Sequence, residues 1–147
     1  MLLQDRLNDD LKTAMKAQDI LTKDTIRLIR AAIKNVEIEK RSELPEEAVI
    51  DVLAKMSKQY RDSISTYRDN GREDLAKKEE DELEVLMRYL PAQLSEIEIR
   101  DLINAAIAQT AAAGPQDRGK VMGIIMPKIK GKADGGVVSK IVGELLG

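Results

Sequence analysis

The sequence predicts an all-α protein, and three features of its 147 residues support that prediction. Apolar residues make up 43% of the chain, which is enough for a core, whereas aromatic residues make up only 2%. The core must therefore consist mainly of leucine, isoleucine, valine, methionine and alanine, as in helical bundles. Apolar positions also recur with helical spacing, and no sustained period-2 alternation indicates strands.

Residues 1–90 are expected to form an elongated N-terminal subdomain of about four helices. The first two helices are predicted by apolar stripes at helical spacing, which run through residues 3–15 and 26–36. A break between these helices is expected near residues 19–22.

The third and fourth helices are bounded by proline and glycine. Pro45 fits the first position of a helix, and the pair Asn70-Gly71 is typical of a helix end. The fourth helix begins with the charged run 77–82, which we interpret as a solvated face. Pro91 disfavours helix at the residue before it and marks a domain boundary.

Residues 91–147 are expected to form a small C-terminal bundle of three helices. Ser95 and Glu98 have the spacing of a capping box, and Gly114-Pro115 should end the helix that they start. Residues 121–126 are expected to form a second, short helix that Pro127 ends. The third helix should follow Gly135 and Gly136 after a basic, glycine-containing loop.

The segment from residue 118 to residue 132 is the candidate nucleic-acid-binding site. It contains five basic residues and no acidic one, although residues 1–90 carry 17 basic and 20 acidic residues. Glycines let a phosphate approach the backbone closely, and lysines supply charge without strict geometry. An alternative interpretation is a turn whose lysines are merely solvated. The candidate residues are Arg118, Gly119, Lys120, Gly123, Lys128, Lys130, Gly131 and Lys132.

The apolar residues between these cations should face the small core, which would leave the cations together in solvent. They are Val121, Met122, Ile125, Met126 and Ile129. The three tyrosines, Tyr60, Tyr67 and Tyr89, are expected in the N-terminal core, so we expect contact with the RNA backbone and not base stacking.

No catalytic residue, metal ligand or cofactor site is predicted. The chain has no cysteine and no histidine, which removes thiolate nucleophiles and the usual proton shuttle. A phosphate-binding P-loop requires serine or threonine after its Gly-Lys pair, but Gly131-Lys132 is followed by Ala133. The net charge is −2, and no apolar run reaches the length of a signal peptide or a membrane span. We therefore expect a cytoplasmic protein.

Four segments resemble the GatB/YqeY family, and specifically its free-standing YqeY-like proteins. They are residues 70–79, 89–95, 119–123 and 127–135, and the resemblance covers nearly the whole chain. It implies a bacterial protein of two helical subdomains, the second similar to the tail of the B subunit of aminoacyl-tRNA amidotransferase. In that enzyme the tail recognises tRNA, while the catalytic chemistry resides elsewhere.

Three functions remain open at this point. The first is a tRNA-binding or adaptor module related to tRNA-dependent amidation, which is not catalytic alone and contacts tRNA electrostatically. The second is a helical protein–protein adaptor for a tRNA synthetase, an amidotransferase or a ribosome-associated factor. The third and weakest is a carbon–nitrogen ligase with glutamine as amido-N-donor, an activity that belongs to the complex and for which this chain carries no residues.

Overall fold

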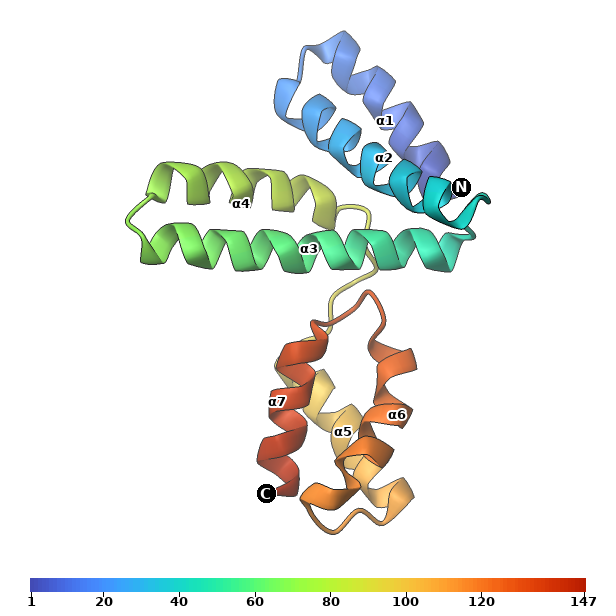
Figure 1. Cartoon of the computed structure of the whole chain (residues 1–147), viewed down its shortest axis with the longest axis vertical. Coiled ribbons are helices and arrows are strands. Elements are labelled where there is room, and N and C mark those ends of the chain that lie inside the picture. The colour runs from blue at the N-terminus through green and yellow to red at the C-terminus, as the bar shows by residue number, and fades with distance from the viewer. The chain divides into compact units, whose positions relative to one another are not determined.

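The computed structural model describes residues 1–147 and contains seven α-helices, one short 3₁₀ helix and no strand (Figure 1). The prediction of an all-α protein is confirmed. Contacts within the chain divide it into two compact units, residues 1–90 and residues 91–147. That each of them folds independently remains a prediction.

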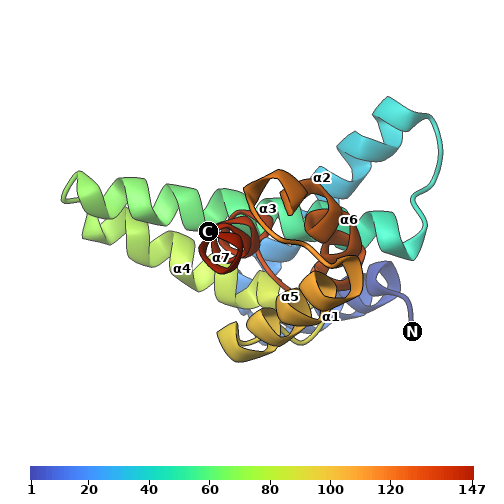
Figure 2. The ribbon, with the colours of Figure 1, turned by 90° about the horizontal axis from the view of Figure 1, so that it is seen from below.

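The N-terminal unit consists of two helical hairpins. Its helices are α1 (Leu3–Ala17), α2 (Ile20–Lys40), α3 (Glu46–Asp69) and α4 (Glu73–Met87). Helix α1 packs on α2 (Figure 1), and α3 packs on α4, as both views of the ribbon show (Figures 1 and 2). Helix α2 also packs on α4, which joins the hairpins around one core.

The core of the N-terminal unit contains side chains from all four helices. Those with no or almost no exposed surface are Leu7, Ile26, Ile29, Val49, Leu53, Val85 and Leu86. The helical stripes of the sequence therefore identify this core well. One apolar residue of the first stripe departs from it, since Met15 is 50% exposed near the end of α1.

The helices of this unit end where local sequence favours an end. Gln18 has a left-handed backbone, and the Asp19 side chain then caps α2 by accepting the Thr22 N–H at 3.1 Å. Gly71 has a φ of 72°, which a glycine adopts without strain, directly after α3. Pro45 precedes the first helical residue by one position instead of occupying it.

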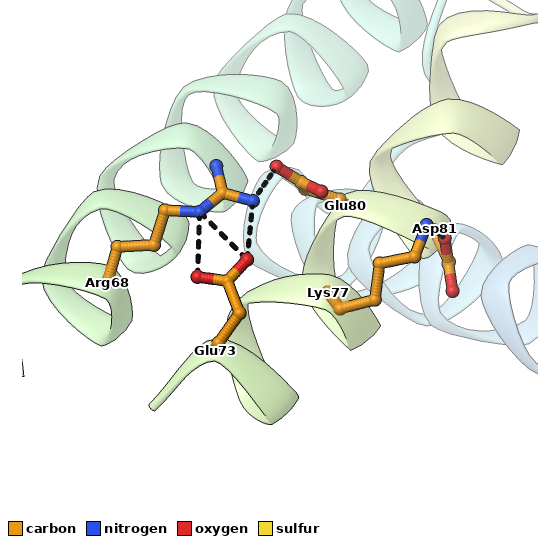
Figure 3. Close-up of polar contacts among 5 residues, drawn as sticks. All are labelled: Arg68, Glu73, Lys77, Glu80 and Asp81. Atoms are coloured by element: carbon orange, nitrogen blue, oxygen red, sulfur yellow. Dashed lines mark hydrogen bonds and ion pairs between the residues drawn. The ribbon is translucent and has the colours of Figure 1, made fainter. Parts of the chain in front are cut away.

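Ion pairs surround the charged run 77–82 of α4, which is partly exposed to solvent. Figure 3 shows Arg68 at the end of α3 between the carboxylates of Glu73 and Glu80, with which it forms ion pairs. One turn further on, the Lys77 ammonium contacts Asp81 at 2.8 Å. These groups are exposed enough for water and salt to screen them, so they orient the hairpin and contribute little to stability.

The C-terminal unit is a three-helix bundle with a core of its own. It contains α5 (Glu96–Thr110), the 3₁₀ helix η1 (Pro115–Asp117), α6 (Arg118–Ile129) and α7 (Gly135–Leu146). Each of the three α-helices packs on the other two. The buried side chains are Ile99, Ile103, Ala106, Val121, Ile125, Ile129, Val138, Ile141 and Val142.

The boundaries of α5 confirm one prediction and correct another. The Ser95 hydroxyl accepts the Glu98 N–H at 3.2 Å, which is the predicted cap. The helix nevertheless ends at Thr110 and not at Gly114-Pro115, because Ala111 adopts a left-handed conformation. Backbone N–H groups just beyond the helix bond to its last carbonyls, so the helix end is satisfied without glycine.

The prediction that Pro127 ends the helix before it is wrong. Helix α6 continues through Pro127 to Ile129, because the one hydrogen bond that proline cannot donate would go to the carbonyl of exposed Gly123. The prediction that Met126 faces the core is also wrong, since its side chain is 47% exposed. Met122 is half-buried. The buried face of α6 is therefore narrower than the sequence suggested.

Candidate nucleic-acid interface

The C-terminal end of α6 brings three of the five candidate cations close together in sequence and space. Lys128 lies in the last turn, Lys130 follows directly after the helix, and Lys132 lies two residues further on. All three are exposed, whereas Ile129 between the first two is buried in the core. The buried isoleucine holds this helix end on the bundle while the lysines extend into solvent.

The turn after α6 has a fixed backbone. Gly131 has a φ of 73°, and the N–H of Lys132 donates to the carbonyl of Ile129 at 2.7 Å. Two groups that precede α5 bind the other side of the turn. The Leu94 N–H donates to the Lys132 carbonyl at 2.9 Å, and the Gln93 side chain donates to the Gly131 carbonyl at 2.8 Å. The lysines therefore extend from a rigid turn and not from a mobile loop.

The two cations at the other end of α6 are engaged within the protein. The Arg118 guanidinium donates to the carbonyl and to the hydroxyl of Ser139 on α7, both at 2.7 Å. The Lys120 ammonium lies 3.5 Å from Asp117, whose pKa is lowered by the Ala113 N–H and by Lys120. Arg118 thus joins α6 to α7, a role that no local pattern in the sequence indicated.

The predicted cationic segment therefore has two ends with different properties. Lys120 and Lys128 are eight residues apart, a rise of about 12 Å along the helix. Gly119, directly before Lys120, and Gly123, between the two lysines, leave open space, with no atom within 4 Å of the position where a Cβ would lie. A partner could approach the backbone of α6 closely on this side.

Two further features concern metal binding and membrane insertion. No group of three or more aspartate, glutamate, histidine or cysteine side chains is placed to hold a metal ion. None of the helices is both long enough and apolar enough to cross a membrane.

The fold is that of a small all-α protein with two helical units, the second of which presents a basic helix end. A family model described as "Yqey-like protein" matches residues 4–146. The chain belongs to this YqeY-like family, as the four sequence segments indicated.

Several curated relatives carry the name "Altered inheritance of mitochondria protein 41, mitochondrial". The protein from Pyrenophora tritici-repentis is 36% identical over 97% of this chain and 80% of its own length. The protein from Kluyveromyces lactis is 41% identical over 70% of this chain and 55% of its own length. For the relative from Vanderwaltozyma polyspora the identity is 47%, over 57% of this chain and 46% of that protein. The chain thus spans about half the length of the yeast relatives.

These relatives contradict the expectation of a bacterial and cytoplasmic protein, because their names place them in the mitochondria of fungi. The physical basis of that expectation was too weak. The lack of a long apolar run does not identify the compartment in which a protein resides.

Proposed function

We propose that this protein is an RNA-binding module, with tRNA as its ligand, that serves tRNA-dependent amidation and is not catalytic alone. One observation carries the proposal: residues 118–132 contain five basic residues and no acidic one, and three of these cations are exposed around one turn. Such a surface attracts phosphates without reading a base sequence.

The rigidity of the turn supports this proposal over simple solvation of the lysines. The hydrogen bonds from Gln93 and Leu94 hold the backbone of Gly131 and Lys132 in place. The side chains of Lys128 and Lys132 form no hydrogen bond or ion pair within the chain. Their charge is therefore available to a ligand, and less backbone entropy is lost when the ligand binds.

Replacing Lys128, Lys130 and Lys132 together with glutamate should weaken tRNA binding by about ten- to a hundredfold at low salt. The slope of log affinity against log salt should fall by about two to three, because each phosphate contact releases about 0.7–0.9 counterion. Titration of labelled tRNA at two or more salt concentrations measures both. The tRNA should include mitochondrial tRNA, given the names of the relatives.

The matched control carries glutamate at Lys12, Lys55 and Lys58, three exposed lysines of the N-terminal unit, and has the same net charge. Both variants should keep the thermal stability of the wild type. Equal loss of binding in the two variants would mean that only net charge matters, and the proposed interface would then be wrong.

A protein–protein adaptor is the second candidate function, and the open side of α6 favours it. Gly119 and Gly123 lie there beside the exposed side chain of Met126. Small residues let another helix approach closely, and methionine adapts to varied apolar surfaces. This candidate replaces the first if wild-type protein does not bind tRNA at low salt.

The purified protein should neither hydrolyse glutamine nor activate a carboxylate with ATP. It has no cysteine and no histidine, and no loop of the P-loop type cradles a phosphate. Assays for glutamate and ADP in the presence of misacylated tRNA test this. Turnover that disappears on substitution of a single serine or acid of this chain would show that the protein is an enzyme.

A further inference from the structure

Four basic side chains form a row along the exposed side of α2 in the N-terminal unit. This α2 basic row consists of Lys23, Arg27, Arg30 and Lys34. Its members are separated by four, three and four residues, so at about 100° per residue all four lie within about 60° of one another. The row extends about 16 Å along the helix axis. The acidic excess of residues 1–90 as a whole conceals this local concentration of charge.

The charges of the α2 basic row are largely available. Arg27, Arg30 and Lys34 are exposed, and their side chains form no hydrogen bond or ion pair within the chain. Lys23 lies 3.7 Å from exposed Asp24, a weak and screened pair. By contrast, six of the ten arginines donate side-chain hydrogen bonds within the protein: Arg6, Arg61, Arg68, Arg72, Arg100 and Arg118.

A groove of about 450 Å³ with a mixed polar and apolar lining lies beside the row, between α1 and α2. Arg30 and Lys34 line it from α2, while Gln4 and Asn8 line it from α1. Glu37 also borders the groove, and its carboxylate accepts the Leu44 N–H at 3.2 Å. The two amides can both donate and accept hydrogen bonds, which suits a ligand that carries hydroxyl groups beside its negative charges.

The structure favours RNA over a lipid surface as the occupant. The apolar face of α2 is buried in the core through Ile26, Ile29 and Ile33, so it cannot insert into a membrane. The exposed apolar side chains of α2 are Ile20, Leu21, Leu28 and Ile38. They are spread over about 27 Å of the helix, with exposed polar residues such as Asp24 and Asn35 between them, so they form no continuous apolar surface. A row of cations beside a groove that two side-chain amides line instead matches a chain of phosphates with sugar hydroxyls.

We propose that the α2 basic row and its groove bind the sugar–phosphate backbone of RNA, as a second contact surface apart from residues 128–132. Arg27, Arg30 and Lys34 contact phosphates, and Gln4 and Asn8 bond to ribose hydroxyls. The inference rests on the proposed function in its choice of RNA as the ligand. It adds a surface in the other unit, and this surface distinguishes RNA from DNA through the 2′-hydroxyl.

The test compares full-length wild type with three variants of equal net charge. The first carries glutamate at Arg27, Arg30 and Lys34, the second at Lys128, Lys130 and Lys132, and the control at Lys12, Lys55 and Lys58. The probes are tRNA, polyuridylate, DNA of the same length as the polyuridylate, and phosphatidylserine vesicles. A further variant, Gln4→Ala with Asn8→Ala, addresses the choice between RNA and DNA.

The first variant should bind both RNAs at least tenfold more weakly than the control, with a salt slope smaller by about two to three. The amide variant should lose most of the wild-type preference for RNA over DNA. If the first variant binds the RNAs as tightly as the control does, the inference is overturned. It is also overturned if the wild type binds the vesicles and only the first variant loses that binding. If only the variant at residues 128–132 loses tRNA, the inference fails and the proposed function stands. If wild type binds polyuridylate through the row but does not bind tRNA, the inference stands and the proposed function fails.

Discussion

A cavity in one core should unfold only the unit that contains it. Leu53 is fully buried in the N-terminal unit, and Ile125 is fully buried in the C-terminal unit. Replacing either residue with alanine should lower the free energy of unfolding of its unit by about 2–5 kcal/mol, because transfer free energy is lost and a cavity is left behind. At about 0.05–0.15 kcal/mol per residue, the C-terminal unit has only about 3–8 kcal/mol of stability. Ile125→Ala should therefore bring it close to complete unfolding.

NMR spectra of the backbone amides of the two variants test this prediction. In Ile125→Ala the resonances of residues 91–147 should lose their dispersion while those of residues 1–90 persist. The N-terminal unit, with 90 residues, is more stable, so in Leu53→Ala the resonances of residues 1–90 should lose their dispersion at a lower temperature than in the wild type. The matched controls are Ile97→Ala and Ile20→Ala, since these isoleucines are 73% and 65% exposed. Both controls should change stability by less than about 0.5 kcal/mol. Loss of all resonances together in either core variant would show one cooperative domain instead of two.

The N-terminal unit should lose stability steeply above pH 10 because it contains two buried tyrosines. Tyr89 is 4% exposed and donates its hydroxyl to Asp10 at 2.5 Å, with the Arg6 guanidinium 5.1 Å from the ring centre. Burial and the Asp10 carboxylate raise the pKa of Tyr89. Tyr60 is 9% exposed, and burial together with Glu82 raises its pKa as well.

The direction of the effect follows from the raised pKa values. In the unfolded chain a tyrosine has a pKa of about 10. Below that pH both tyrosines are protonated in the folded and in the unfolded state, so their full contribution to the stability of the folded unit is present. As pH rises above 10, the unfolded chain ionises while the folded chain keeps its protons, so stability is lost. At pH 12, two units above the unfolded value, the loss is about 2–3 kcal/mol for each tyrosine, at about 1.4 kcal/mol per unit.

Thermal unfolding between pH 8 and pH 12 measures this loss. A variant with phenylalanine at both Tyr60 and Tyr89 should have a flatter dependence on pH, even if the lost hydrogen bond to Asp10 lowers its stability near pH 8. Tyr67→Phe, at a half-buried position, is the control. Lysine deprotonation affects all these proteins alike. Parallel curves for wild type and the double variant would contradict the assignment of the loss to these two phenols.

Much of the fold could be predicted because it depends on local rules. Leucine and isoleucine at helical spacing identified the buried faces of α1, α2 and α3, and Asn70-Gly71 and Ser95 identified helix ends. These features depend on residues within one or two turns of each other, so a sequence read in short windows contains them. The motifs of residues 119–135 likewise sufficed to recognise the family.

The errors concern positions where contacts from distant residues outweigh local preference. Pro127 stays within α6 because Ile125 and Ile129 are buried on the bundle, and this packing offsets the loss of one hydrogen bond. Met126 is exposed because the bundle covers only a narrow face of α6. Local sequence fixed neither result.

The sequence alone determined the helical class, the helix stripes, the acid-free basic segment and the family of this protein. Only the tertiary structure decided which cations are available. Arg118 binds Ser139, which is 21 residues away in sequence, whereas Arg27, Arg30 and Lys34 extend from α2 without a partner. The physical reason is that the charge at a site depends on the groups within a few ångströms of it, and folding brings those groups together from anywhere in the chain.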